Sequence, residues 1–379
     1  MSRLLTFIAF ISVAITLYSL LNYYFIRKHN NAVKLKELPS ILWRLVLITI
    51  ILTPIATVIF SMNGHPFLAA ITGFTGYSWL AFLFLFLIIH GLADIILFAF
   101  EKFGYHPSPA TPRIIFILTM IINFSILIYG YYEAKNIQVE EIIVQTDKLP
   151  PNKKEISIVQ LSDIHFSPII STDSALRICS IVKAARPDII VSTGDFLDRG
   201  IRDAEKITAI FRTMKAPLGK FAITGNHEFI SGIELSTRFT EAAGFKLLRN
   251  EIIDAGSVLS LVGIDDPTYK QYTDKKPLIS ESALLTAADK KRFVLLLKHQ
   301  PKIEDKSLGL FDLQLSGHTH GGQIFPFTLL VRIPFRYICG FYNLDKGSKL
   351  YVSRGTGTWG PPIRFLAPPE ITVIRILKK

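Results

Sequence analysis

Long apolar runs dominate the first third of the chain. Four of them reach the length of roughly 20 residues that a helix needs to cross a bilayer, and they cover residues 4–25, 41–60, 77–100 and 114–131. The first run is too long for the core of a signal peptide, and no small-x-small cleavage site follows it. The pattern therefore predicts an anchor of four transmembrane helices over residues 1–132.

After this region the apolar runs become short and alternate with amphipathic segments. A polar connector over residues 133–152, with some strand character at 142–145, leads to a globular domain over 153–379. Short apolar runs predict strands at 156–161, 189–192, 220–224, 292–297, 313–315, 350–353 and 371–376. Helical patterns lie among them at 174–185, 202–214, 232–243 and 282–290. Such alternation is typical of a layered α/β domain.

The cations between the apolar runs predict an orientation. The loop after the first run carries Arg27, Lys28, Lys34 and Lys36, and the loop after the third carries Lys102 and Arg113. The loop over residues 61–76 carries neither Lys nor Arg. Because Lys and Arg concentrate in cytoplasmic loops, we expect a multi-pass protein of a bacterial-type inner membrane, with its globular domain outside the cytoplasm.

Two ionisable residues interrupt the third apolar run. His90 and Asp94 are four residues apart and therefore share one face of a helix. Such groups are costly inside a membrane, so they form either a polar contact between helices or part of a proton path. We favour the contact between helices.

Charge and cysteine content narrow the function only slightly. Half of the residues are apolar and the formal net charge is +12. Residues 151–379 hold 32 Lys and Arg against 23 Asp and Glu, a surplus of nine that is spread along the chain without a long basic block. This balance suits anionic substrates or an anionic lipid surface, and we expect no nucleic-acid partner. Cys179 and Cys339 are the two cysteines, and we expect no disulfide between them.

Clusters of polar side chains follow five of the predicted strands. Their residues are Asp163-Ile-His165, Gly194-Asp195-Phe-Leu-Asp198, Gly225-Asn226-His227-Glu228, His299 and Gly317-His318-Thr-His320. Donors carried on several strand ends can converge on one point, and the glycines allow the backbone to approach closely there. Carboxylate oxygens and imidazole nitrogens are ligands for pairs of divalent ions about 3.5–4 Å apart in two-metal hydrolases. The sequence therefore predicts a two-metal site.

The ordered motifs resemble those of the calcineurin-like metallophosphoesterase superfamily. Three further segments, Gly317–Gln323, Tyr351–Gly357 and Pro368–Thr372, resemble its membrane-tethered bacterial phosphodiesterase branch. The resemblance covers about residues 150–379. It implies a calcineurin-like αββα sandwich, in which two mixed sheets are flanked by helices.

The same resemblance implies roles for individual residues. The first metal would be held by Asp163, His165 and His320, the second by Asn226, His299 and His318, and both by Asp195. The two divalent ions would be Mn, Fe or Zn. His227 would stabilise the transition state or protonate the leaving group, and Asp198 would orient His227. Glu228 and Arg199 would support the loops through salt bridges.

The implied activity is the metal-dependent hydrolysis of a phosphodiester or pyrophosphate bond by an activated hydroxide, with a lipid-linked phosphoester as the expected substrate. The resemblance includes hydrolases that cleave the pyrophosphate of UDP-2,3-diacylglucosamine in lipid A synthesis. That reaction is an alternative, since it needs a cytoplasmic face. A membrane sensor or transporter with a phosphate-binding metal domain is a second alternative. A phosphoprotein phosphatase is a third, although the membrane tether and the short C-terminal region argue against it.

One apolar run lies directly behind the last histidine motif. Residues 324–337 combine aliphatic and aromatic side chains with Arg332 and Arg336. The simpler interpretation is an ordinary buried hairpin. In the alternative, the run enters the outer leaflet or grips an acyl chain, and the two arginines meet headgroup phosphates. Phe325 and Phe327 would then contact the substrate together with these arginines.

Overall fold

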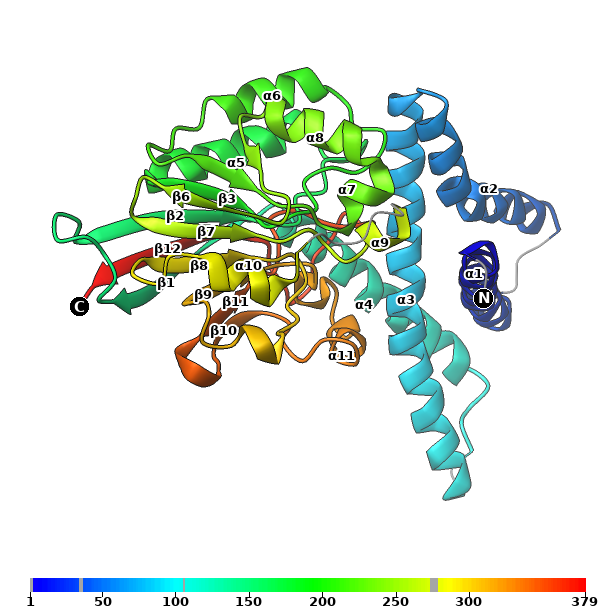
Figure 1. Ribbon diagram of the computed structural model, residues 1–379. Coiled ribbons are helices and arrows are strands. Elements are labelled where there is room, and N and C mark those ends of the chain that lie inside the picture. The colour runs from blue at the N-terminus through cyan, green and yellow to red at the C-terminus, as the bar shows by residue number, and fades with distance from the viewer. Residues whose placement is uncertain (1–2, 34–36, 105, 273–278) are drawn as a thin grey trace. The chain divides into compact units, whose positions relative to one another are not determined.

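The computed structural model describes residues 3–33, 37–104, 106–272 and 279–379. The chain divides into two compact units, each described by itself below (Figure 1). The first unit contains Met1–Phe60 and Leu68–Gly130. The second contains Ser61–Phe67 and Tyr131–Lys379.

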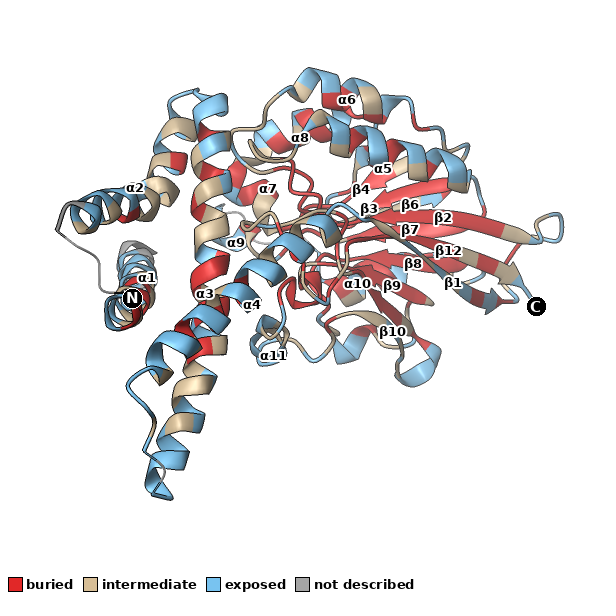
Figure 2. Ribbon diagram, turned by 180° about the vertical axis from the view of Figure 1, so that it is seen from behind, coloured by how far each residue is buried: buried red, intermediate tan, exposed pale blue. Residues whose placement is uncertain are grey.

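Four long helices contain the predicted apolar runs. They are α1 (Arg3–Ala32), α2 (Glu37–Met62), α3 (Pro66–Lys102) and α4 (Thr111–Glu133). Among the described residues, three segments are long and apolar enough to cross a membrane: Pro39–Met62, Pro66–Lys102 and Thr111–Glu133. Many of their apolar side chains are exposed, as suits helices that face lipid (Figure 2). α1 is not among these three segments, so the predicted first span stays a prediction.

Helix α3 is longer than expected. Its 37 residues extend for about 55 Å, well beyond the roughly 30 Å apolar core of a bilayer. The predicted span began only at residue 77 and so left out Gly73 and Gly76. Both glycines are buried in the structure. They are packing positions inside a continuous helix, as small residues often are between membrane helices.

His90 and Asp94 of α3 join it to α1. Asp94 Oδ1 accepts a hydrogen bond from Lys28 Nζ at 2.7 Å, and Asp94 Oδ2 accepts one from Tyr24 Oη at 2.7 Å. His90 Nδ1 lies 3.2 Å from the same tyrosine oxygen. The favoured interpretation, a polar contact between helices, is confirmed. The cation of Lys28 compensates the carboxylate that the apolar helix carries.

The second unit is built around two mixed sheets of six strands. The strand order of the first is β1-β12-β2-β3-β4-β5. These strands are β1 (Gln138–Thr146), β12 (Glu370–Lys378), β2 (Glu155–Leu161), β3 (Ile189–Ser192), β4 (Lys220–Ala222) and β5 (Lys246–Leu247). All neighbours are parallel except β12 and β2. Strand β1 lies within the residues predicted as a connector.

The strand order of the second sheet is β10-β11-β9-β8-β7-β6. Its strands are β10 (Gly340–Asn343), β11 (Lys349–Val352), β9 (Leu313–Ser316), β8 (Phe293–Leu297), β7 (Leu259–Gly263) and β6 (Glu251–Ala255). The outer pairs β10–β11 and β6–β7 are antiparallel, and the remaining pairs are parallel. The expectation of two mixed sheets is confirmed.

Apolar residues hold four layers together (Figures 1 and 2). Because successive residues of a strand point to opposite faces, Ile158 packs between the sheets while Val159 packs toward helices. Those helices are α5 (Thr172–Ala185), α6 (Ala204–Arg212) and α8 (Ile233–Ala242). On the outer face of the second sheet, Leu285 of α10 (Glu281–Ala287) packs in one cluster with Val294 of β8. The sandwich therefore has helices on both outer faces.

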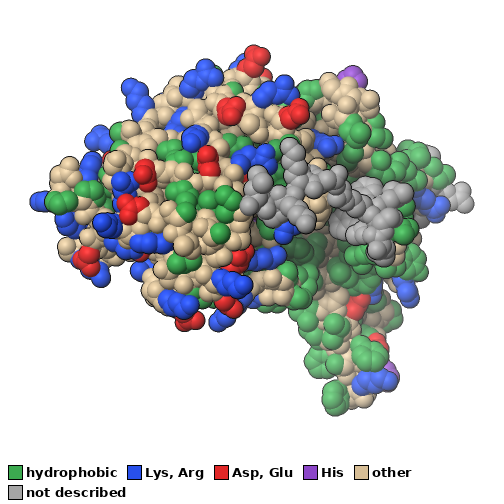
Figure 3. All heavy atoms as spheres, in the orientation of Figure 1, with side chains coloured by type: hydrophobic (Ala, Val, Ile, Leu, Met, Phe, Trp, Pro, Cys, Tyr) green, Lys and Arg blue, Asp and Glu red, His purple; other side chains and the backbone are tan. Residues whose placement is uncertain are grey.

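Charged residues are scattered over the second unit. On the face in view, Lys and Arg side chains are interspersed with Asp and Glu (Figure 3). Cys179 is buried, Cys339 is half-buried, and both are free thiols. The expectation of no disulfide is confirmed. Three short helices complete the unit: α7 (Asn226–Ser231), α9 (Tyr269–Tyr272) and α11 (Phe327–Val331).

Candidate functional site

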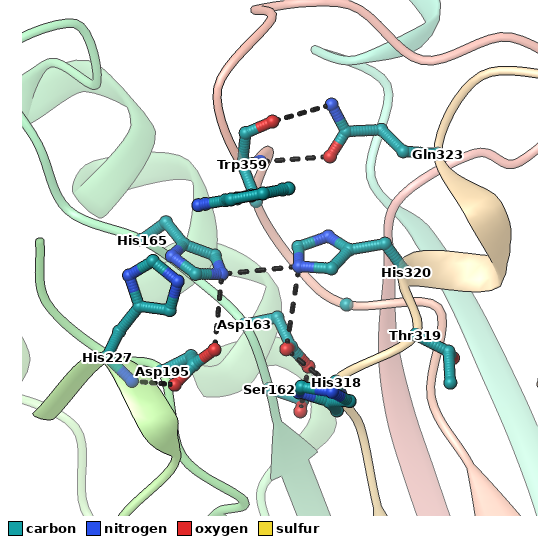
Figure 4. A network of polar contacts seen from close by, with 12 residues as sticks. Ser162, Asp163, His165, Asp195, His227, His318, Thr319, His320, Gln323 and Trp359 are labelled. Carbon is teal, nitrogen blue, oxygen red and sulfur yellow. Dashed lines mark hydrogen bonds and ion pairs between the residues drawn. The ribbon is translucent and has the colours of Figure 1, made fainter. Parts of the chain in front are cut away.

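The predicted donors lie in loops at the carboxyl ends of five strands. Asp163, Asp195 and Asn226 follow the parallel strands β2, β3 and β4 of the first sheet. His299 and His318 follow the parallel strands β8 and β9 of the second. Since parallel strands end at the same edge of a sheet, each sheet presents its donors together. Figure 4 shows several of them converging.

A first group of donors contains Asp163, His165 and His320. The Nε2 atoms of the two histidines lie 3.2 Å apart, and His320 Nε2 lies 3.5 Å from Asp163 Oδ1. One ligand atom from each residue lies within 4.8 Å of the others. All three side chains are buried. The group has the size and composition to hold one cation.

A second group contains Asp195, His299 and His318, whose ligand atoms also lie within 4.8 Å of one another. His318 Nδ1 is 3.0 Å from His299 Nε2. Asn226 joins the group, because its Oδ1 is 3.2 Å from the same His299 nitrogen. These four side chains offer two oxygens and two imidazole nitrogens to one point.

The carboxylate of Asp195 lies between the two groups. Its Oδ2 is 3.6 Å from His165 Nε2 in the first group and 3.3 Å from His299 Nε2 in the second. Its Oδ1 accepts a hydrogen bond from the main-chain N–H of His227 at 2.8 Å. The structure thus brings all seven predicted donors together.

The imidazole contacts fit a metal site. His299 Nδ1 lies 2.8 Å from the carbonyl oxygen of Thr193 and donates to it, which directs Nε2 into the second group. Burial opposes a charge on His299, but the carboxylates of Asp195 and Asp163 hold the pKa of His299 well above its usual value in the absence of a cation. Likewise, His165 Nδ1 faces Asp198 Oδ1 at 3.2 Å, which directs His165 Nε2 into the first group. Two pairs of imidazole nitrogens face each other, His165 with His320 at 3.2 Å and His299 with His318 at 3.0 Å. Each pair is suited to sharing one cation. The mixture of oxygen and imidazole donors suits several divalent metals.

Burial and neighbouring charges keep two of the histidines neutral. Burial and the charge of His299 lower the pKa of His318 to about 4. Burial and the Arg364 guanidinium hold the pKa of His320 well below its usual value. A metal ligand must be deprotonated at the coordinating nitrogen. Both imidazoles are therefore in the form that binds a cation at neutral pH.

The backbone is strained at most of the donors. Asp163, His165, Asp195, His318 and His320 have φ angles of 50°, 52°, 52°, 72° and 52°. A residue other than glycine rarely adopts this left-handed conformation, which costs on the order of 1–3 kcal/mol. Such strain persists where surrounding contacts impose it and is concentrated at functional sites.

Glycine is required at two motif positions, because a carboxylate lies very close to the backbone there. A Cβ atom on Gly225 would lie 2.2 Å from Asp195 Oδ1, and one on Gly317 would lie 2.1 Å from Asp163 Oδ2. Both distances are far shorter than a van der Waals contact. The carboxylates of Asp163 and Asp195 therefore occupy the space that any larger residue at these positions would need.

Glu228 supports the loops differently from the expectation. Its buried carboxylate accepts three main-chain hydrogen bonds, from Asp195 at 3.0 Å, Phe196 at 2.7 Å and Gly225 at 2.6 Å. No ion pair of Glu228 or of Arg199 occurs among the residues that the structure describes. The predicted salt bridge of Glu228 is wrong, because main-chain N–H groups take the place of the cation.

His227 and Asp198 form a pair beside the donors. His227 Nδ1 lies 2.6 Å from Asp198 Oδ1. Burial opposes the charge on His227, but the nearby Asp195 carboxylate and the hydrogen bond to Asp198 raise the pKa of His227 to about 9. Burial likewise opposes the charge on Asp198, but His165 and His227 lower the pKa of Asp198 below its usual value. The pair therefore carries a protonated imidazole at neutral pH.

Sequence reasoning missed Arg364. This side chain is fully buried, and its Nη1 donates to the carbonyl oxygens of His320 at 3.0 Å and Arg354 at 2.7 Å. Its Nη2 lies 3.3 Å from His320 Nδ1. Arg364 follows Pro361 and Pro362 in an irregular segment, where no periodic pattern marks it as buried. It fixes the loop that carries His320.

Trp359 was also missed. Its main-chain N–H donates to Gln323 Oε1 at 2.9 Å, and Gln323 Nε2 donates to its carbonyl oxygen at 3.0 Å (Figure 4). The ring centroid of Trp359 lies 5.9 Å from that of His227. Gln323, the last residue of the histidine motif, thereby places an aromatic ring beside the protonated imidazole.

The four predicted substrate contacts lie outside the donor groups. Phe325, Phe327, Arg332 and Arg336 flank or belong to α11, and all four are exposed. The buried-hairpin interpretation is wrong, because α11 contains no buried residue. Contact between this run and the donors is made by Phe335, whose ring centroid lies 5.0 Å from that of His318.

Comparison with known proteins agrees with this geometry. A family model described as "Calcineurin-like phosphoesterase" matches residues 156–322, which contain all seven donors. The chain is 36% identical over 258 residues to an uncharacterized metallophosphoesterase of Aquifex aeolicus, covering 66% of this chain and 96% of the relative. It is 33% identical over 335 residues to another from Helicobacter pylori, covering 86% of each.

A further relative has a name that mentions the membrane. It is a "Transmembrane protein with metallophosphoesterase domain" from Danio rerio, 30% identical over 274 residues, with 69% of this chain and 62% of the relative covered. The resemblance expected from the motifs is therefore confirmed. With its two mixed sheets and converging donors, the chain belongs to the calcineurin-like metallophosphoesterase family of metal-dependent phosphoester hydrolases.

Proposed function

We propose that this protein is a membrane-anchored phosphoesterase with two divalent metal ions, which hydrolyses phosphodiester or pyrophosphate bonds. The observation that carries the proposal is the position of Asp195. Its carboxylate lies within 3.6 Å of His165 in one donor group and within 3.3 Å of His299 in the other. A carboxylate between two sets of donors is suited to bridging two cations.

The proposed ligands divide into two sets. Asp163, His165 and His320 would hold the first ion. Asn226, His299 and His318 would hold the second, and Asp195 would serve both. The ions are Mn, Fe or Zn, since mixed oxygen and imidazole donors accept each of them. When bound, such a pair supplies Lewis acidity for the phosphoryl group and lowers the pKa of water from ~15.7 toward 7.

His227 is the proposed general acid. Its Nδ1 is engaged by Asp198 at 2.6 Å, so a proton on Nε2 is free to pass to the leaving oxygen. The raised pKa of about 9 keeps that proton on the ring at neutral pH. Asp198 also contacts His165 Nδ1 and thereby couples the orientation of the acid to that of a proposed metal ligand.

The membrane part of the proposal follows from the apolar helices and their loops. Three segments are apolar and long enough to span a bilayer. The cations around the first and third apolar runs favour an extracytoplasmic catalytic unit in a bacterial-type inner membrane. A lipid-linked phosphoester on that side is the proposed substrate. The hydrolysis of UDP-2,3-diacylglucosamine remains an alternative that requires the opposite orientation.

Turnover by the purified full chain tests the proposal. Protein reconstituted with Mn should hydrolyse bis-p-nitrophenyl phosphate. His227→Ala should reduce turnover by roughly 10²–10⁴-fold and leave the bound metal unchanged. His106→Ala, at an exposed position of the first unit, is the matched control. Wild-type protein that binds Mn but hydrolyses no phosphoester would instead favour a sensor or transporter.

A further inference from the structure

A set of exposed apolar side chains, called the apolar rim below, lies on two segments beside the candidate site. It consists of Phe325, Leu329, Leu330, Ile333, Trp359 and Leu366. Their exposed fractions lie between 43% for Phe325 and 81% for Ile333. Contiguous apolar patches on protein surfaces mark sites of interaction. The rim therefore requires an occupant.

The rim is formed by two segments that are tied to each other. Ile324 and Phe365 form a parallel bridge, in which Phe325 N–H donates to the Phe365 carbonyl oxygen at 3.0 Å. Phe365 N–H donates to the Gln323 carbonyl oxygen at 2.9 Å. The Gln323 side chain bonds the main chain of Trp359. These bonds make one surface out of residues 325–333 and 359–366.

One end of the rim lies at the candidate site. The Trp359 ring lies beside His227, with centroids 5.9 Å apart. The segment that follows the rim residue Ile333 reaches His318 through Phe335. An apolar chain lying along the rim would thus have its polar end near the donors.

Leu366 of the rim is bonded to Glu133, near the beginning of the segment Tyr131–Lys379 of the second unit. Leu366 N–H donates to Glu133 Oε2 at 3.1 Å. Glu133 is the last residue of α4, and both residues belong to the second unit. The chain emerges from its last apolar helix at this point. Phe365, next to Leu366, is bonded to Phe325 of the rim.

Two cations accompany the apolar side chains. Arg332 and Arg336 are exposed, and neither forms an ion pair with a carboxylate in the described part of the chain. The guanidinium of Arg336 lies over the ring of Tyr337, 5.3 Å from its centroid. Apolar side chains flanked by cations without a carboxylate partner are typical of segments that lie in a membrane interface. Near anionic headgroups each such cation contributes about 1 kcal/mol.

We propose that the apolar rim docks on an anionic lipid bilayer, so that the enzyme takes its phosphoester from the membrane surface. Leu329, Leu330 and Ile333 enter the interface, and Arg332 and Arg336 contact headgroup phosphates. The docking itself is independent of catalysis. Its consequence for the substrate rests on the proposed function, because it assigns to that same site an amphiphilic phosphoester.

A fluorescent label tests the docking directly. Full-length protein carrying Cys339→Ser and Ile333→Cys is labelled with an environment-sensitive dye and reconstituted into phosphatidylcholine and phosphatidylglycerol vesicles. The matched control carries Leu176→Cys at an exposed position of α5. Nitroxide-bearing lipids should quench the rim label at least about threefold more than the control label. Equal quenching of both labels overturns the docking, as does a rim label shielded from water but not quenched by lipid.

A pair of chromogenic diesters tests the consequence for the substrate. Methyl and hexadecyl p-nitrophenyl phosphate share the leaving group and differ in the apolar chain. Leu329→Ser combined with Leu330→Ser should lower kcat/KM for the hexadecyl ester in vesicles about tenfold and leave that for the methyl ester unchanged. The control is Leu176→Ser combined with Leu235→Ser, at exposed positions of α5 and α8.

The outcomes separate the two proposals. Equal loss on both esters, or no loss on either, overturns the selection of membrane substrates by the rim. Failure of the wild-type protein to hydrolyse either ester, or bis-p-nitrophenyl phosphate, counts against the proposed function. The label experiment still decides whether the rim docks, because it does not depend on turnover.

Discussion

Replacing Glu228 with Gln should loosen the loops that carry the bridging carboxylate and the neighbouring asparagine. Glu228 Oε2 accepts from the N–H groups of Asp195 and Gly225, and Oε1 accepts from that of Phe196. A glutamine has nearly the same shape but keeps one acceptor oxygen. Its amide group must then face at least one N–H donor.

The size of the destabilisation by Glu228→Gln follows from counting the N–H donors that lose their acceptor. If the remaining oxygen replaces Oε2, the N–H of Phe196 loses its partner, and in the other orientation Asp195 and Gly225 lose theirs. An unpaired buried N–H costs about 1–3 kcal/mol, and the two bonds that survive lose their charge assistance. We expect the free energy of opening these loops to fall by about 2 kcal/mol. At 1.36 kcal/mol per factor of ten, this corresponds to about 30-fold in the opening equilibrium constant.

Hydrogen exchange measured by mass spectrometry can detect this local change. In metal-free protein, Glu228→Gln should reduce protection about 30-fold in peptides that cover residues 194–197 and 224–229. Metal affinity should fall by about 10–100-fold, as is common for groups that support metal ligands. Glu234→Gln makes the same charge change at an exposed position of α8. Unchanged protection in both peptides, or an equal loss in the control, would refute the reasoning.

Three further predictions concern charges elsewhere. Because the pKa of His227 is raised to about 9, its imidazolium is lost as pH rises through that value, and turnover should fall there. Asp198→Asn removes a carboxylate that raises this pKa, so the alkaline fall in kcat should move to lower pH. Arg364→Met leaves main-chain oxygens around His320 without donors and should cost roughly 3–5 kcal/mol, seen as a lower Tm, with partial recovery in Arg364→Lys. Lys28→Met leaves the Asp94 carboxylate without its cationic partner and should cost roughly 1–3 kcal/mol, with recovery on adding Asp94→Asn, as a double-mutant cycle of thermal stability would reveal.

The strands that carry the donors could be predicted closely. The strand predicted at 189–192 coincides with β3, and the prediction at 156–161 differs from β2 by one residue. Each of these segments is mainly aliphatic, is buried along nearly its whole length and is followed by a polar cluster. Burial on both faces makes such strands recognisable, because a continuous apolar run bounded by turn residues has few other interpretations.

The outer strands were harder to identify. β6 is only partly buried over most of its length, and β5 has two residues. β10 begins at a glycine and alternates between half-buried and exposed side chains. Such edge strands are stabilised by pairing with neighbours, so local composition gives little indication of them.

The donors could be predicted from sequence, but the main-chain partners of the residues that support them could not. Glu228 and Arg364 act through main-chain atoms of other loops, and no local pattern specifies those partners. The burial predicted for residues 324–337 was wrong for a related reason. Its apolar composition suggested burial, whereas exposure depends on whether another element covers it, and the structure leaves α11 uncovered.

The central claim is that seven side chains from five strand ends form one site for two cations that share Asp195. The most direct test is the number of divalent ions per chain, measured by elemental analysis after equilibrium dialysis against Mn. Wild-type protein should bind two ions, and Asp195→Ala should weaken both. Saturation at a single ion, or two ions bound with unchanged affinity by Asp195→Ala, would contradict it.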